Sequence, residues 1–292
     1  MYEIYDLGER CHYVECPSRI GIINTVEGKV SFIDSGNDKS AAKKALKAIS
    51  ERGWQLESVY CTHSHADHIG GCKYLCEETG CKIYAPGVEA AMTRYTYLEP
   101  TLLYGGYPMQ ALRGKFMIAD PSPALPLTDE ALPTGIHRIA LPGHTPEMTG
   151  YITDDGVAFI GDAIAPESTL NKYGIFYLYD VGAYLESLDT LEKLDCRVYL
   201  PSHSSPISDI SGIVNYNRQK ISEICDKIVG ICDTGMGFDD ILSKVLSEYG
   251  LNMTVEQYAL IGSTLRSYLS YLTDGGKLKI IIDQNTLKWQ KS

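Results

Sequence analysis

The sequence lacks any stretch that could cross a membrane, because it contains no run of eighteen consecutive apolar residues. Its first residues also lack a basic region followed by an apolar segment, so they do not resemble a secretion signal. Internal repeats and low-complexity tracts are missing as well. We therefore expect a soluble, cytoplasmic protein with no membrane partner.

Cysteine pairs with the spacing of common zinc sites are also missing. The chain holds nine cysteines, an odd number, and free thiols are the default in a reducing compartment. Cys72, Cys76 and Cys81 form a local group, but three and four residues separate them, unlike the usual zinc pairs. We interpret them as ordinary buried or half-buried thiols.

Positive charge is scarce, since the formal net charge is -11. Residues 210–292 hold nine basic and nine acidic side chains, so the whole acidic excess lies in residues 1–209. A surface of this sign repels phosphate backbones, which argues weakly against nucleic acid as the substrate.

The length of 292 residues exceeds the usual size of one domain, and the composition changes after Pro206. In the first part, β-branched runs surround a turn at residues 27–29, and helical periodicity covers residues 39–51. Strands are expected at residues 21–26, 30–34, 58–61, 136–141, 150–153, 157–160 and 197–200. This alternation predicts an α/β layered domain over residues 1–209.

Residues 88–130 interrupt that alternation with glycines, prolines, methionines and aromatic residues. A stretch this long and irregular is either a lid or binding loop, or a surface excursion packed by its own aromatic side chains. Both readings stay open. If it is a lid, the candidate substrate contacts are Tyr95, Tyr97, Tyr104 and Tyr107, since aromatics line small-molecule pockets.

Residues 210–292 predict three helices and a terminal hairpin, a pattern like that of a winged helix. A capping box at residues 254–257 starts the third helix at about Val255, and its only basic residue is Arg266. A helix that reads DNA is normally basic. We therefore expect this domain to pack on the catalytic domain, or on a second subunit in a homodimer, and not to read DNA.

The central motif is His63-Ser64-His65-Ala66-Asp67-His68, directly after an expected strand. Imidazoles and a carboxylate suit zinc and similar ions. Extended backbone points His63 and His65 to one side, so they can hold one ion, while Asp67 and His68 face a second.

Two ions need further ligands. His144, Asp162 and His203 each stand at or just beyond the end of an expected strand, where ligand-binding residues of α/β proteins gather. Of seven histidines, only His12 and His137 fall outside the proposed site.

Together the motifs resemble the metallo-β-lactamase superfamily over residues from about 5 to 206. The matching elements, in order, are Asp34 in Phe32-Ile33-Asp34-Ser35-Gly36, the run at 63–68, Gly143-His144-Thr145, Gly161-Asp162 and Ser202-His203. The resemblance implies a four-layer αββα sandwich, with two β-sheets face to face and helices outside. To this the C-terminal pattern adds the small helical domain.

The resemblance also implies a role for each candidate residue. His63, His65 and His144 would bind the first ion, Asp67, His68 and His203 the second, and Asp162 would bridge both. Asp34 would orient the ligand loop by hydrogen bonds. Zinc is the expected metal, with iron and manganese as alternatives.

Two residues narrow the family. Asp162 makes the set similar to glyoxalase II, lactonases and related esterases, whereas β-lactamases usually have Cys or Ser near that role. His65 separates the chain from di-iron relatives that carry glutamate there. Glu147 departs from the common pattern, which has glycine, and we expect it to alter substrate access.

The expected reaction is hydrolysis of a small-molecule ester, thioester or lactone. Two cations about 3.5–4 Å apart would hold a bridging hydroxide at cellular pH, and Asp67 would act catalytically by passing its proton to the leaving group. The alternatives are an RNA or DNA phosphodiesterase, an iron-dependent oxygen-using enzyme of this fold, and a DNA-binding regulator with an inactive hydrolase domain.

Overall fold

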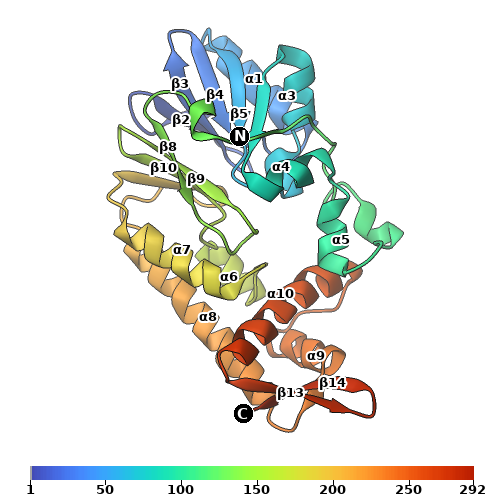
Figure 1. Ribbon diagram of the computed structural model, residues 1–292. Helices are drawn as coiled ribbons and strands as arrows, with labels where there is room; N and C mark the ends of the chain where they lie inside the picture. The colour runs from blue at the N-terminus through green and yellow to red at the C-terminus, as the bar shows by residue number, and fades with distance from the viewer. Residues whose placement is uncertain (1) are drawn as a thin grey trace.

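The computed structural model describes residues 2–292, and two β-sheets dominate its first two thirds (Figure 1). The larger sheet has seven strands in chain order, antiparallel from the first to the fourth and parallel from there on. Its strands are β1 (Ile4–Asp6), β2 (Cys11–Val14), β3 (Ile20–Val26), β4 (Lys29–Ile33), β5 (Gln55–Tyr60), β6 (Lys82–Ala85) and β7 (Leu125–Pro126).

The second sheet has four strands in the order β11-β10-β9-β8. They are β8 (Ile136–Ala140), β9 (Thr149–Thr153), β10 (Val157–Gly161) and β11 (Val198–Pro201). All strands expected from the sequence are present, with bounds shifted by a few residues at most.

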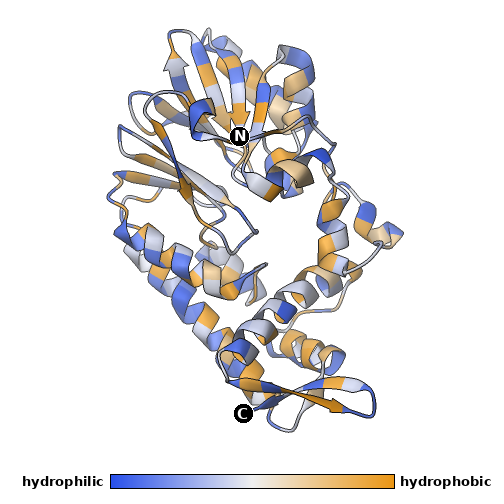
Figure 2. Cartoon of the chain, in the orientation of Figure 1, coloured by the Kyte–Doolittle hydropathy of each residue, from blue (hydrophilic) through white to orange (hydrophobic). Residues whose placement is uncertain are grey.

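Side-chain alternation along the strands builds the layers, because successive residues of a strand point to opposite faces. On β4, Phe32 packs in one cluster with helices α1 (Lys39–Glu51) and α3 (Cys72–Thr79), whereas its neighbour Ile33 packs in another with Tyr151 and Phe159 of the second sheet. The second sheet in turn packs on α7 (Val181–Lys193) through Ala158. The predicted four-layer αββα sandwich is thereby confirmed. Figure 2 shows hydrophobic and hydrophilic residues alternating along the helices, as expected for elements with one buried side.

The cysteine group lies in the helix-facing cluster. Cys72 and Cys81 are buried there, and Cys76 packs against it. All three are free thiols, and none belongs to a group that could hold a metal among the described residues.

Residues 88–130 are more regular than expected. They contain most of α4 (Gly87–Arg94), then α5 (Leu98–Tyr104), the 3-10 helices η1 (Gln110–Arg113) and η2 (Asp129–Ala131), and β7. These helices span eight residues or fewer, too short for the periodicity windows that reveal a helix in a sequence. Pro100 obscured α5 further, although it lies in the first turn, where helices tolerate proline.

The C-terminal part follows the expected order of three helices and a hairpin. It comprises α8 (Ser211–Ile231), α9 (Phe238–Glu248), α10 (Val255–Asp274), β13 (Leu278–Asp283) and β14 (Thr286–Lys291), with β12 (Met236–Gly237) pairing to β14. The winged-helix assignment stays a prediction. Within the described residues, no helix is long and apolar enough to cross a membrane.

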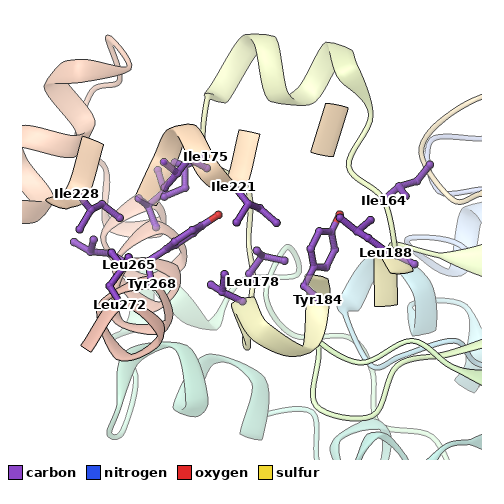
Figure 3. Packing of buried hydrophobic residues seen from close by; sticks show 14 of the residues in the cluster. Ile164, Ile175, Leu178, Tyr184, Leu188, Ile221, Ile228, Leu265, Tyr268 and Leu272 are labelled. Carbon is purple, nitrogen blue, oxygen red and sulfur yellow. The ribbon is translucent and has the colours of Figure 1, made fainter. Parts of the chain in front are cut away.

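One hydrophobic cluster runs across the expected domain boundary at residue 209. Figure 3 shows Tyr184 and Leu188 of α7 in the same cluster as Ile221 of α8 and Leu265 and Tyr268 of α10. The division into two domains stays a prediction, and the two parts share a core.

Candidate metal centre

Two adjacent parallel strands position the central loop. β4 and β5 run parallel, so Asp34, after β4, lies beside the loop that follows β5. One Asp34 oxygen accepts from the Thr62 amide (2.7 Å), and the other accepts from the Thr62 hydroxyl (2.8 Å) and lies 2.9 Å from Nδ1 of His68. Asp34 has a φ of 62°, which is uncommon for a residue other than glycine. These hydrogen bonds hold that conformation and fix the loop.

The structure brings all seven expected ligands together. Nε2 of His63 lies 3.0 Å from Nδ1 of His65, which lies 2.9 Å from Nε2 of His144. Ligand atoms within 4.8 Å of one another form three groups: His63, His65 and His144; His63, His68 and Asp162; and Asp67, His68 and His203.

Asp162 lies between these groups. Its Oδ2 is 3.5 Å from Nε2 of His144, 3.5 Å from Nε2 of His68 and 3.3 Å from Nε2 of His203. Oδ2 of Asp67 lies 3.2 Å from Nε2 of His203. One oxygen of Asp162 thus faces ligands of both expected ions.

The second ring nitrogen of each histidine has a partner elsewhere, which fixes the ring orientation. These contacts are His63 Nδ1 with Thr62 Oγ1 (2.9 Å), His65 Nε2 with Glu99 Oε1 (3.2 Å), His68 Nδ1 with Asp34, His144 Nδ1 with the Tyr177 carbonyl (3.1 Å) and His203 Nδ1 with the Pro17 carbonyl (3.0 Å). Five ring nitrogens are therefore left to face the centre of the site.

Metal ions fit this arrangement. Nε2 of His68 and Oδ1 of Asp162 are buried without a hydrogen-bond partner, which is costly unless another group binds them. Imidazole nitrogens and carboxylate oxygens are ligands that zinc, iron and manganese accept.

The electrostatics differ between the two sides of the site. Burial lowers the pKa of His144 to about 3 and the pKa of His63 well below its usual range, so both rings are neutral at pH 7. On the other side, the Asp162 carboxylate raises the pKa of His203 to about 10. Burial would raise the pKa of Asp67, but the charge of His68 and the hydrogen bond from His203 outweigh it and lower that pKa.

A cavity of about 280 Å³ opens beside the group of Asp67, His68 and His203. Its lining includes Asp67, His203, Ser18, Lys115 and Phe116. The Asp67 side chain is 44 % exposed, against 15 % for Asp162. A larger cavity, about 810 Å³, lies between α8 and α10 and includes none of the metal-group residues.

The four tyrosines proposed as substrate contacts do not line the smaller cavity beside Asp67 and His203. Tyr95, Tyr97, Tyr104 and Tyr107 are exposed, and the Tyr107 hydroxyl accepts a hydrogen bond from Arg113 instead. Their role stays a prediction.

Other residues of the same stretch do reach the site. Glu89 on α4 is fully buried and accepts from the amide and hydroxyl of Ser64 and from the amide of Glu147, so it ties the 63–68 loop to the His144 loop. Glu99 contacts His65, as described above. Neither glutamate could be predicted as a site residue, since no local pattern marks an acid whose partner lies 25 or more residues away.

The effect of Glu147 on substrate access stays a prediction. Its carboxylate accepts a hydrogen bond from the Val88 amide at the start of α4, and it does not line that cavity. The two histidines outside the site bind elsewhere, His12 to Asp6 and His137 to Asp154.

Comparisons with known proteins agree with this geometry. The chain is similar to proteins named hydroxyacylglutathione hydrolase from Albidiferax ferrireducens (30 % identity over 181 residues, 59 % of this chain and 58 % of that protein) and Rhodobacter capsulatus (30 % over 158 residues, 54 % and 50 %). It thus spans about half the length of these curated relatives.

Two solved structures resemble the chain over nearly its full length. A beta-lactamase domain protein from Burkholderia ambifaria has a TM-score of 0.77 at 16 % identity, covering 99 % of this chain and 94 % of that one. A metallo-beta-lactamase family protein from Thermus thermophilus has a TM-score of 0.73 at 17 % identity, covering 100 % and 99 %. At these identities the likeness shows the fold alone. Residues 14–203 match the metallo-beta-lactamase superfamily, so the chain belongs to that superfamily.

Proposed function

We propose that the protein is a metal-dependent hydrolase of a small thioester, ester or lactone, working with two ions, zinc first among the candidates. The observation that carries the proposal is the convergence of five imidazoles and two carboxylates into three groups with ligand atoms within 4.8 Å. The curated relatives named hydroxyacylglutathione hydrolase support a thioester as the first substrate to test.

His63, His65 and His144 would hold one ion and Asp67, His68 and His203 the other, with Asp162 between them. Bound there, two cations would supply Lewis acidity, lowering the pKa of water and stabilising negative charge on a substrate oxygen. Asp34 and Thr62 keep the 63–68 loop in place, so the ligands need little reorganisation.

Asp67 would be the residue that moves a proton. Asp67 is the more exposed of the two carboxylates within the metal groups, and it lines the small cavity beside His203. As an ionised carboxylate it would accept a proton at an oxygen and return it to a leaving group.

The proposal is tested with full-length protein loaded with Zn²⁺ and assayed on a panel of S-lactoylglutathione, a small lactone, a β-lactam, an aryl phosphodiester and RNA. We expect turnover of the thioester or the lactone, abolished by a chelator and restored by Zn²⁺. His203→Ala should lose this activity. The matched control is His137→Ala, which removes an exposed histidine that belongs to none of the metal groups, and this variant should keep the activity. Turnover of RNA or the phosphodiester alone would overturn the substrate class, and chelator-resistant turnover would overturn the metal requirement.

A further inference from the structure

Two of the five site histidines are oriented from outside the sandwich. Nε2 of His65 lies 3.2 Å from Oε1 of Glu99, on α5, and Nδ1 of His144 lies 3.1 Å from the carbonyl oxygen of Tyr177. The remaining three use partners at strand ends and loops of the larger sheet. The two histidines oriented from outside belong to the same group, the one completed by His63.

Helix α10 of the C-terminal part packs against the helix that carries Glu99. Leu103 on α5 is buried in a cluster with Leu112, Met117 and Ala259, and Ala259 belongs to α10. Figure 1 shows α5 next to one end of α10. Since Glu99 is itself buried, its position depends on this packing.

The same helix holds the segment that contains Tyr177. The Leu178 amide donates to Oγ1 of Thr264 (3.3 Å), and Oγ of Ser267 donates to the Tyr179 carbonyl (2.7 Å). Both Thr264 and Ser267 lie on α10, one turn apart. The residues on either side of Tyr177 are thus hydrogen-bonded to α10, and the Tyr177 side chain packs against the Leu103 cluster.

We propose that α10, α5 and residues 177–179 form a brace that positions His65 and His144, so that the C-terminal part of the chain sets the metal affinity of the His63, His65 and His144 group. Groups that orient a ligand histidine are typically worth about 10–100-fold in metal affinity. Within residues 2–292, the Asp67, His68 and His203 group has no contact of this kind with α10, because His68 and His203 are oriented by Asp34 and the Pro17 carbonyl, so the brace would act on one ion and leave the other unchanged. The inference rests on the metal assignment of the proposed function and on no substrate.

The first test removes the carboxylate. Full-length apoprotein is titrated with Zn²⁺ in competition with a chromophoric chelator, for wild type, Glu99→Ala and Glu99→Gln. In Glu99→Ala we expect one of two ions to bind about 10–100-fold more weakly and the other to bind as in wild type. Glu99→Gln should lose less Zn²⁺ affinity than Glu99→Ala, because the glutamine amide oxygen can still accept a hydrogen bond from Nε2 of His65. The control Glu78→Ala removes an exposed glutamate on α3 and should bind both ions as wild type does.

The second test reaches the site from α10 alone. The double variant Thr264→Val with Ser267→Ala removes both hydrogen bonds to residues 178 and 179, and Ser270→Ala is its control, an exposed serine on the same helix. The double variant should weaken the binding of the same ion. The absorption spectrum of bound Co²⁺ should show that the change is at the His63, His65 and His144 group, whose ligands are all nitrogens.

The outcomes separate the inference from the proposed function. The brace would be rejected if both ions bound equally more weakly, or if neither Glu99→Ala nor the α10 double variant weakened the binding of an ion. The chelator titration shows this without any substrate. If the wild-type protein binds no ion at all, both the brace and the proposed function are rejected. If metal binding changes selectively but no substrate on the panel is hydrolysed, only the proposed reaction fails.

Discussion

Replacing Asn217 by alanine should destabilise the protein by several kcal/mol. Asn217 lies on α8 and is completely buried. Its Oδ1 accepts from the Ala165 amide (2.9 Å) and the Tyr184 hydroxyl (2.9 Å), and its Nδ2 donates to the carbonyls of Ala165 (3.0 Å) and Ile213 (2.9 Å). One amide thus joins α8 to α7 and to the segment that follows Asp162.

The magnitude follows from the groups that lose a partner. Ala165 would keep a buried N–H and C=O, and Tyr184 a buried hydroxyl, each without its bond to Asn217. Each buried polar group left unsatisfied costs about 1–3 kcal/mol, so the three groups together predict a cost of about 3–9 kcal/mol for Asn217→Ala. Tyr184→Phe leaves Oδ1 of Asn217 bonded to Ala165 and should cost about 1 kcal/mol. A domain is typically stable by about 5–15 kcal/mol, so the larger loss is easily measured.

Urea unfolding followed by circular dichroism measures both variants, and the midpoint should fall while the slope stays unchanged. Asn252→Ala, at an exposed asparagine, is the control and should change stability by less than about 0.5 kcal/mol. A loss below about 1 kcal/mol in Asn217→Ala would show that this amide does not join the helices as the structure describes.

Three further predictions concern the site and the C-terminal part. Asp67→Ala should lower kcat by more than about a thousandfold in a folded protein, and near-wild-type turnover would remove Asp67 from the mechanism. Gly143→Ala should prevent stable folding, because φ at Gly143 is +121° and a Cβ there would overlap the backbone of Tyr184; a thermal melt like that of wild type would contradict this. Full-length protein should show no salt-dependent binding to duplex DNA in fluorescence anisotropy, and tight, salt-sensitive binding would refute the assignment of α10 as a packing helix.

Most of the strands, and the convergence of the candidate ligands, could be predicted because their signals are local, whereas β1, β6 and β7 were not predicted individually. β-branched runs mark the strands, and the ligands stand at strand ends in a fixed order along the chain. α7 was not predicted, although Asp180 caps it and its buried residues Val181, Tyr184 and Leu188 follow helical spacing. Both the N-cap and this spacing are local signals of a helix.

The groups that orient the ligands could not be predicted in the same way. Glu99 and His65 are 34 positions apart, and nothing in the local sequence around Glu99 distinguishes it from a surface glutamate of a short helix. Tyr177 acts on His144 through its backbone carbonyl, a group that every residue carries. Such contacts depend on tertiary packing, which decides how residues 88–130 fold back onto the site and where the segment around Tyr177 lies.

Packing also decides what α10 can do. Its sequence argued against DNA reading only because basic residues are few, but the structure adds a steric reason. Ala259 packs toward α5, while Leu265 and Tyr268 pack into the large cluster with α7 and α8, so two sides of the helix are covered. Its one basic side chain, Arg266, stacks 3.7 Å above the ring of Phe238. A recognition helix needs one free face lined with donors for the groove. A helix covered on two sides, with its only cation already engaged, fits the proposed role of holding the surrounding elements in place, which the metal-affinity experiments test.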